Sequence, residues 1–173
     1  EVFCEQLVRA GTTLCFAYSS VHPQACDALF TALDRWGLRA IAGPVLMDED
    51  APVELLLPID AALEGLEGLR ARWHGHEGRL QLAVVPRFAL CCSMDAMTRG
   101  GAWARTHGLW VSTHVAENLE ECRVARAKFG TADYLQVYED AGLVHDRSVY
   151  AHCIHFSDQA WGRFADAGAV VAH

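Results

Sequence analysis

Short apolar runs recur along the chain, and each is followed by a segment with the spacing of an amphipathic helix. The runs are almost continuously apolar rather than alternating, which is typical of strands in a parallel sheet that is packed on both faces. We expect strands at Thr12–Ser19, Leu38–Met47, Arg79–Pro86, Leu109–His114, Ser148–His155 and Ala169–His173.

The intervals between these runs carry helical patterns. From Pro23, a residue favoured at a helix start, to the stop signal Gly37, apolar residues recur at i, i+3, i+4 and i+7 and predict one buried stripe. The pair Gly100–Gly101 makes the segment around it a poorer helix. Further helices are expected within Ile59–Gly75, Ser93–Gly108, Glu117–Gly130, Ala132–Gly142 and Ser157–Gly168.

This alternation of strand and helix is the signature of the α/β class with a parallel sheet. Six predicted strands within 173 residues match the density of a (β/α)8 TIM-like barrel, which takes about 250 residues when complete. A doubly wound sheet would favour a glycine-rich phosphate turn after the first strand, and the segment AYSSVHPQ is not one. Because the chain opens on Glu1 and ends within a strand-like run, we expect residues 1–173 to be a single partial barrel domain, an excerpt of a longer protein.

Composition and charge narrow the classes of function. Lys and Arg number 14 against 22 Asp and Glu, and the net charge of −8 argues against a nucleic-acid partner. No run of about 18 apolar residues indicates a membrane span, and no signal peptide is recognisable. Seven cysteines, an odd number without a Cys-x-x-Cys pair, favour free thiols in a reducing, cytoplasmic compartment.

Polar residues stand at the ends of several predicted strands. In the stretch LWVSTHVAEN, His114 ends a buried strand and Glu117 follows three residues later. Arg87 and Phe88 follow the preceding strand, and His152 lies in the next one. Because the active sites of barrels lie at the carboxyl ends of the strands, these side chains would face one cavity.

Each of these residues also has an ordinary structural interpretation. His114 and His152 could be hydrogen-bonded core histidines. Glu117 could be an acid in a first helical turn, where the helix dipole favours it, and Arg87 could be a surface residue in a turn. Four such coincidences, each at the carboxyl end of a strand, are less economical than one shared site.

A shared site gives each residue type a task. Neutral imidazoles are ligands of zinc-like ions, which lower the pKa of a bound water to about 7 and so supply hydroxide at neutral pH. Glu117 could carry a proton from that water to a leaving group. Arg87 offers a planar fork of donors that matches paired acceptors such as O6 and N7 of guanine, and Phe88 could stack on a flat ring.

Longer motifs connect these residues with a known family. STHVAEN and VYAHCIHFSD resemble the fifth- and sixth-strand motifs of metal-dependent deaminases of the amidohydrolase superfamily. AGTTLCFAYSSVHPQACDALF, IAGPVLMDEDAP, RWHG and VVPRFAL resemble guanine deaminases in particular. The motifs occur in order over almost the entire chain, and VPRF together with HVAEN is the discriminating pair.

The resemblance implies a (β/α)8 barrel, of which this chain covers roughly strands 2 to 7, that hydrolyses guanine to xanthine and ammonia. It implies that His114 binds one divalent metal ion, zinc or iron, that His152 binds the metal or holds its hydroxide, and that Glu117 shuttles the proton. Arg87 and Phe88 match the guanine-binding pair of the family. A small purine substrate, no nucleic-acid or membrane partner, a cytoplasmic location and a homodimer are the accompanying expectations.

The metal site of the family needs more ligands than these. It also uses a His-x-His pair on the first strand and an aspartate on the eighth, and we expect both to lie outside residues 1–173. His74-Gly75-His76 has the spacing of the pair, but it follows a helix and precedes a strand, which places it at the opposite rim. We therefore reject it as the metal pair. A structural role is the default for His22, Cys91, His155 and His173.

Two alternatives stay open at this point. Another amidohydrolase, either a deaminase of a different aminated heterocycle or a chlorohydrolase of a halogenated one, would share His114, Glu117 and His152. It need not keep Arg87 and Phe88, so a panel of substrates separates the two activities. A non-catalytic barrel fragment would bind no metal and turn over no substrate.

Overall fold

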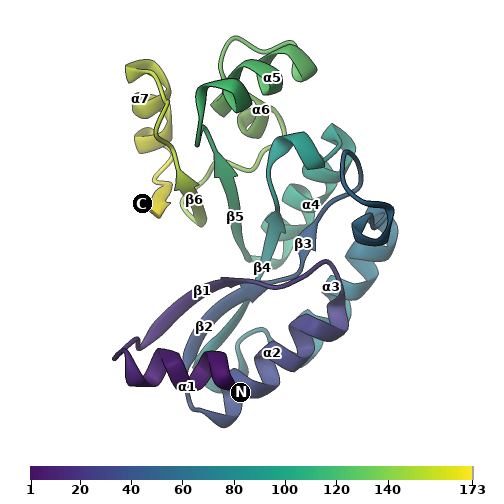
Figure 1. The fold of residues 1–173 in the computed structure, drawn as a ribbon, viewed down its shortest axis with the longest axis vertical. Coiled ribbons are helices and arrows are strands. Elements are labelled where there is room, and N and C mark those ends of the chain that lie inside the picture. Colours follow the sequence, from purple (N-terminus) through teal and green to yellow (C-terminus); the bar gives the residue numbers. More distant parts are fainter. Residues whose placement is uncertain (173) are drawn as a thin grey trace.

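A computed structural model of the protein describes residues 1–172 and shows one curled sheet of parallel strands (Figure 1). The order in the sheet is β1-β2-β4-β5-β6-β7, and the short β3 pairs with the carboxyl-terminal end of β4. The strands are β1 (Leu14–Tyr18), β2 (Arg39–Gly43), β3 (Val45–Leu46), β4 (Leu80–Pro86), β5 (Trp110–Val115), β6 (Ser148–His152) and β7 (Val170–Ala172). The predicted parallel α/β architecture is confirmed, and His173, at the end of the last predicted strand, lies outside the described residues.

Helices cover the convex side of this sheet, and its concave side stays open (Figure 1). They are α1 (Val2–Arg9), α2 (Pro23–Arg35), α3 (Ile59–Trp73), α4 (Met94–His107), α5 (Leu119–Phe129), α6 (Tyr134–Asp140) and α7 (Asp158–Asp166). Three short 3-10 turns complete the elements: η1 (Val53–Leu55), η2 (His76–Gly78) and η3 (Ala89–Cys91). The arrangement is a half-barrel in which β1, β3, β4, β5 and β6 each lead to a helix on the convex side.

One predicted strand, Leu38–Met47, is two strands in the structure, because the chain breaks at Pro44 between β2 and β3. Proline has no N–H to donate to a neighbouring strand. Gly43 explains the close approach just before the break, since a Cβ there would lie 2.1 Å from the carbonyl oxygen of Ala83 on β4. Because of this break, β3 pairs with the carboxyl-terminal end of β4, and Met47 lies near that end.

Helix α4 is regular although Gly100–Gly101 weakens its sequence pattern. A Cβ at Gly101 would lie 2.9 Å from Leu143 Cδ2, and one at Gly100 would lie 3.2 Å from Leu46 Cδ1. The glycines therefore lower the helix propensity but allow α4 to pack closely against its neighbours. Tertiary packing outweighs propensity in this segment.

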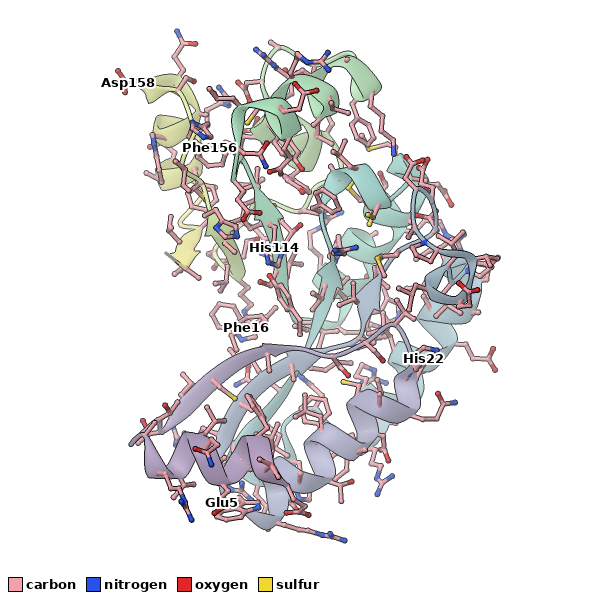
Figure 2. The ribbon with its side chains drawn as sticks, viewed as in Figure 1. Glu5, Phe16, His22, His114, Phe156 and Asp158 are labelled. Atoms are coloured by element: carbon pink, nitrogen blue, oxygen red, sulfur yellow. The ribbon has the colours of Figure 1, made fainter. Side chains whose placement is uncertain are left out.

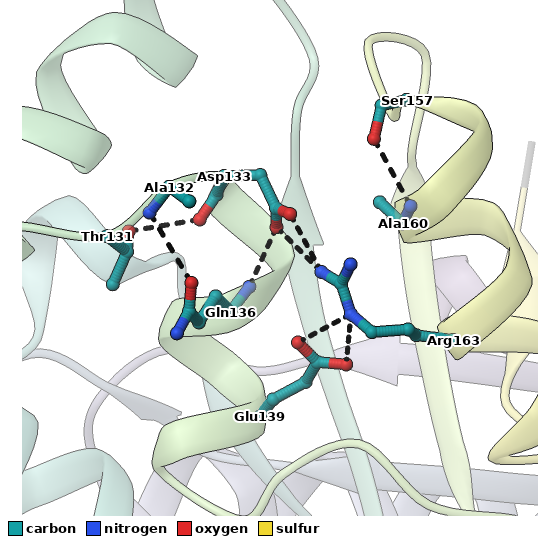
Figure 3. A network of polar contacts seen from close by, with 8 residues as sticks. All are labelled: Thr131, Ala132, Asp133, Gln136, Glu139, Ser157, Ala160 and Arg163. Atoms are coloured by element: carbon teal, nitrogen blue, oxygen red, sulfur yellow. Dashed lines mark hydrogen bonds and ion pairs between the residues drawn. The ribbon is translucent and has the colours of Figure 1, made fainter.

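The outer layer is held together by aromatic packing and by ion pairs. Tyr150 of β6 contacts Tyr138 of α6 edge-on at a centroid distance of 5.3 Å and lies at the same distance from Phe164 of α7. Arg163 of α7 donates to both carboxylate oxygens of Asp133 and of Glu139 (Figure 3), and these bonds raise its pKa. Helices α6 and α7 are thus fixed to each other across the outside of β6.

All seven cysteines are free thiols, as the odd count predicts, and six of them are buried. Among residues 1–172, no helix combines the length and the apolar character needed to cross a bilayer.

Candidate active site

The five residues proposed from the sequence line one pocket of about 280 Å³ at the carboxyl ends of three neighbouring strands. Arg87 and Phe88 follow β4, His114 lies in β5, Glu117 follows β5, and His152 ends β6. Figure 2 shows His114 on β5 at the concave side of the sheet. Parallel strands bring their carboxyl ends to the same rim, and this is why residues far apart in sequence meet here.

The strand register brings the two histidines together. His114 of β5 is opposite Ala151 of β6, and Val115 is opposite His152, so the imidazoles come from adjacent positions along the pair. Their ring centroids are 5.4 Å apart, with the planes tilted by 38°. The two rings therefore lie next to each other in the same pocket.

The backbone turns sharply where β5 and β6 end. Ala116, His152 and Cys153 have φ values of 52°, 74° and 57°, in the left-handed region that costs a residue with a Cβ about 1–3 kcal/mol. Two hydrogen bonds hold these turns together, from Cys153 N to Val115 O at 2.9 Å and from His155 N to Ala116 O at 3.1 Å. The fold therefore sustains strain at the two strand ends that aim Glu117 and His152 into the pocket.

The protonation state of His114 follows from its partner. Its Nδ1 lies 3.1 Å from the carbonyl oxygen of Arg87, and its backbone N donates to the same oxygen at 3.3 Å. A carbonyl only accepts hydrogen bonds, so Nδ1 carries the proton and Nε2 keeps its lone pair. Burial lowers the pKa of His114, which keeps the ring neutral at neutral pH. Metal-binding histidines commonly have this arrangement, so the residue fits a divalent ion.

Glu117 is held by its backbone and keeps its carboxylate free. The first turn of α5 fixes it: Glu117 N donates to Glu121 Oε2 at 3.1 Å, and Glu121 N donates to Asn118 Oδ1 at 2.9 Å. The side chain of Glu117 is half exposed, and its Oε2 lies 3.7 Å from His152 Nε2. A carboxylate on an anchored backbone beside an imidazole can accept and return a proton.

The guanidinium of Arg87 lies among sulfur and aromatic groups. Within residues 1–172 its guanidinium forms no ion pair; Nη1 lies 3.6 Å from Met47 Sδ and 3.9 Å from Cys91 Sγ. The group also lies 5.5 Å from the centroid of the Phe88 ring. Soft sulfur and aromatic contacts support the side chain without using up its donors, which stay available for a ligand with paired acceptors.

Comparison with known proteins places this site in a family. The sequence profile described as "Amidohydrolase family" matches residues 1–173. The chain belongs to the amidohydrolase family. It is 37% identical over 172 residues to a guanine deaminase of Escherichia coli (strain K12), which covers 98% of this chain and 39% of that protein. It is 36% identical over 173 residues to a probable guanine deaminase of Deinococcus radiodurans, covering 99% and 39%.

Solved amidohydrolase structures agree with the fold. The structure of E. coli guanine deaminase superposes with a TM-score of 0.94 at 35% identity, over 98% of this chain and 40% of that one. The match confirms the predicted class, because the curled half-barrel corresponds to a fragment of a TIM barrel. The chain spans about two fifths of the length of the relatives it matches.

Other candidate residues of this amidohydrolase lie outside the pocket. His22 precedes α2, with Nδ1 3.2 Å from Ser20 Oγ, and His155 lines a separate pocket beside α5, α6 and α7. His74 and His76 precede β4, at the amino end of the strand, in agreement with their rejection as a metal pair. His173 lies outside the described residues.

Three residues near the site were not singled out from the sequence. Tyr18 at the end of β1 lies over His114 with ring centroids 4.9 Å apart, and Met47 contacts Arg87 as described above. Both stand at the end of a predicted strand, so their position was a usable signal. Tyr138 lies in α6 and reaches the site only through a hydrogen bond of its hydroxyl to the His114 carbonyl, for which the sequence offers no comparable sign.

Proposed function

We propose that residues 1–173 form part of the (β/α)8 barrel domain of a longer guanine deaminase, which converts guanine and water to xanthine and ammonia. The observation that carries the proposal is the convergence of Arg87, Phe88, His114, Glu117 and His152 on one pocket. The names of the relatives, two bacterial guanine deaminases at 36–37% identity, support the same activity.

We assign His114 and His152 to a single divalent metal ion, with zinc as the first candidate and iron as the second. Neutral imidazole is a good ligand for both, and the remaining ligands would lie outside residues 1–173. When bound, such an ion supplies an acidified water, with a pKa of about 7, as the nucleophile. His114 contributes Nε2, since its Nδ1 proton is engaged by the Arg87 carbonyl.

Glu117 is the proton carrier of the proposed reaction. As the water oxygen bonds to C2 of guanine, the carboxylate of Glu117 passes a proton from the water to the purine ring. It then protonates the exocyclic nitrogen, so that the C2–N bond breaks and ammonia leaves, while an aspartate outside residues 1–173 would act as the other base. Arg87 binds the acceptor edge of the purine through its free guanidinium, and Phe88 packs against the flat ring. The positions of these two residues beside His114 would orient the purine for attack.

Assembly and location follow from the same assignment. We infer a homodimer of the full-length protein, in accordance with the family resemblance. A cytoplasmic location suits seven free thiols, six of them buried, and a substrate that arises inside cells.

The direct test replaces Glu117 by Gln in the full-length protein and measures ammonia release from guanine together with bound metal. We expect turnover to fall by about 10²–10⁴-fold while the metal content stays unchanged, because the amide keeps the shape but cannot carry the proton. Glu120→Gln is the matched control, since Glu120 is exposed three residues later, in the first turn of α5, and pairs with Arg123. Turnover near that of the parent in Glu117→Gln would remove the residue from its role.

A panel of guanine, adenine, other aminated heterocycles and a chlorinated triazine tests the substrate. If only guanine releases ammonia, the result supports guanine as the substrate, bound by Arg87 and Phe88. Preference for another ring would move the protein to a different amidohydrolase activity, and absence of both metal and turnover would indicate a non-catalytic barrel.

A further inference from the structure

The hydroxyl of Tyr138 is buried behind the site, where it takes part in several hydrogen bonds. It donates to the carbonyl oxygen of His114 at 2.8 Å and accepts from the backbone N of Ala89 at 2.9 Å and from Thr113 Oγ1 at 3.2 Å. A phenol has one proton and two lone pairs, so these three bonds satisfy the hydroxyl, and the Tyr134 hydroxyl is a further, more distant neighbour at 3.5 Å. The side chain is fully buried, and no solvent can replace a lost partner there.

The partners of this hydroxyl belong to the two halves of the proposed site. Ala89 directly follows Arg87 and Phe88, the residues assigned to the purine. His114 is the residue assigned to the metal. A second link on the same path is the Arg87 carbonyl, which accepts from both the backbone N and the ring Nδ1 of His114.

The two links act together. The Arg87 carbonyl fixes the ring of His114, and the Tyr138 hydroxyl fixes the distance between the turn that carries this carbonyl and the end of β5. If the turn moves away from the strand, the purine contact and the imidazole orientation change at once. A displacement of about 1 Å in such a site costs on the order of 10²-fold in rate.

We propose that Tyr138 is a positioning residue for the reaction: its hydroxyl holds the purine-binding turn after β4 in register with the metal-facing histidine of β5. This inference rests on the proposed function. It assigns to helix α6, which contributes no side chain to the pocket, a defined part in setting the geometry of the pocket.

The test compares Tyr138→Phe with Tyr150→Phe in the full-length protein. Tyr150 is equally buried, contacts Tyr138 edge-on, and within residues 1–172 its hydroxyl has no hydrogen-bond partner. Both substitutions remove one buried hydroxyl and keep the ring, so they differ only in the bonds that are lost. For each variant we would measure kcat and KM for guanine, the thermal midpoint, and the visible spectrum of the protein loaded with Co²⁺ in place of its own metal.

We expect Tyr138→Phe to lower kcat/KM by about 10–100-fold, with a raised KM, and to shift the Co²⁺ spectrum recorded without guanine. Tyr150→Phe should leave both within about twofold of the parent. A Tyr138→Phe protein with kcat/KM and spectrum equal to those of Tyr150→Phe would overturn the proposal. Equal losses in both variants, proportional to their thermal midpoints, would also overturn it, because they would show a purely structural effect.

Thr113→Val provides a second variant in case Tyr138→Phe does not fold. It removes one of the two donors to the hydroxyl while keeping the shape of the side chain, and it should change KM and spectrum in the same direction by a smaller factor. An unchanged spectrum and KM in Thr113→Val would then count against the proposal. Failure of the proposed function is distinguishable: the parent would release no ammonia from guanine, while the Co²⁺ spectra would still report whether Tyr138 orients His114.

Discussion

The two rims of the sheet carry similar residue types, namely histidine, arginine and acidic residues. They differ in how closely these residues pair with one another. At the amino ends of the strands, Asp34, His76 and Glu77 surround Arg79, whose Nη2 lies 2.8 Å from Asp34 Oδ1 and 2.6 Å from Glu77 Oε2. His76 Nε2 lies 3.2 Å from the same Asp34 oxygen. In the pocket at the carboxyl ends, the imidazole of His152 lies 3.7 Å from the carboxylate of Glu117, and the guanidinium of Arg87 has no carboxylate partner within residues 1–172.

Proximity of potential ligands is therefore a poor guide to function in this molecule. Donor atoms of Asp34, His76 and Glu77 lie within 4.8 Å of one another, close enough in principle for one cation. Arg79 already supplies the positive charge, so the group is a closed ion-pair network. The carboxyl rim has looser spacing, but its imidazole lone pair and its guanidinium are left unused. Groups that the fold positions and does not neutralise are the ones available for chemistry.

The largest expected effect is a difference in metal content and turnover between two variants, each with one histidine replaced at one rim. His114→Asn in the full-length protein should lose metal and reduce turnover of guanine by about 10³-fold or more, since the ion contributes several kcal/mol to the barrier. His76→Asn should keep metal content and turnover unchanged. Metal analysis and an ammonia assay on both proteins check this, and equal metal loss at the two rims would erase the distinction between them.

The second-largest expected effect is on the KM for guanine, after removal of the charge at Arg87. Arg87→Met should raise KM for guanine by about 10–100-fold and leave the metal content unchanged, because a buried ligand edge would lose a charged, forked partner. Steady-state kinetics with guanine measure it. A KM that stays at the parental value would show that Arg87 does not contact the purine.

Most of the fold could be predicted from the sequence, because strand and helix periods depend on local spacing. The exceptions have long-range causes. Leu38–Met47 divides at Pro44, and the backbone at Gly43 approaches β4 too closely for a Cβ, which only the paired strand reveals. The weak pattern at Gly100–Gly101 becomes a regular helix because neighbouring side chains require small residues there.

The candidate site could be predicted as a set of residues but not as a geometry. His114, Glu117 and Arg87 were identifiable because strand ends in a parallel sheet share one rim and because the motifs resemble a family. The proton position on His114 depends on a carbonyl 27 residues away, and the role inferred for Tyr138 depends on a hydroxyl 24 residues away. Contacts of this kind follow from packing, and no residue pattern along the chain encodes them.

A smaller effect tests the closed network at the amino rim. Arg79→Met should lower the free energy of unfolding by about 1 kcal/mol, because the partly exposed arginine bonds Asp34, Glu77 and the carbonyl of Leu38. KM for guanine should not change. Urea unfolding and steady-state kinetics measure the two quantities, and a raised KM without loss of stability would contradict a purely structural role for this rim.

The smallest effect is a pH dependence at the amino rim. His74 Nδ1 accepts from the backbone N of Leu82 at 3.2 Å, and burial lowers the pKa of the ring. A histidine whose folded pKa is depressed stabilises the fold above its unfolded pKa of about 6.5, and this contribution is lost as pH falls through the lower folded value.

His74→Gln keeps an acceptor for Leu82 but removes the titration. The drop in unfolding free energy between about pH 7.5 and 5.5 should therefore be smaller in the variant than in the parent, by less than about 1.4 kcal/mol. Equal drops in urea titrations of the two proteins would show that protonation of His74 costs the fold nothing, and that the acid sensitivity of the protein arises elsewhere.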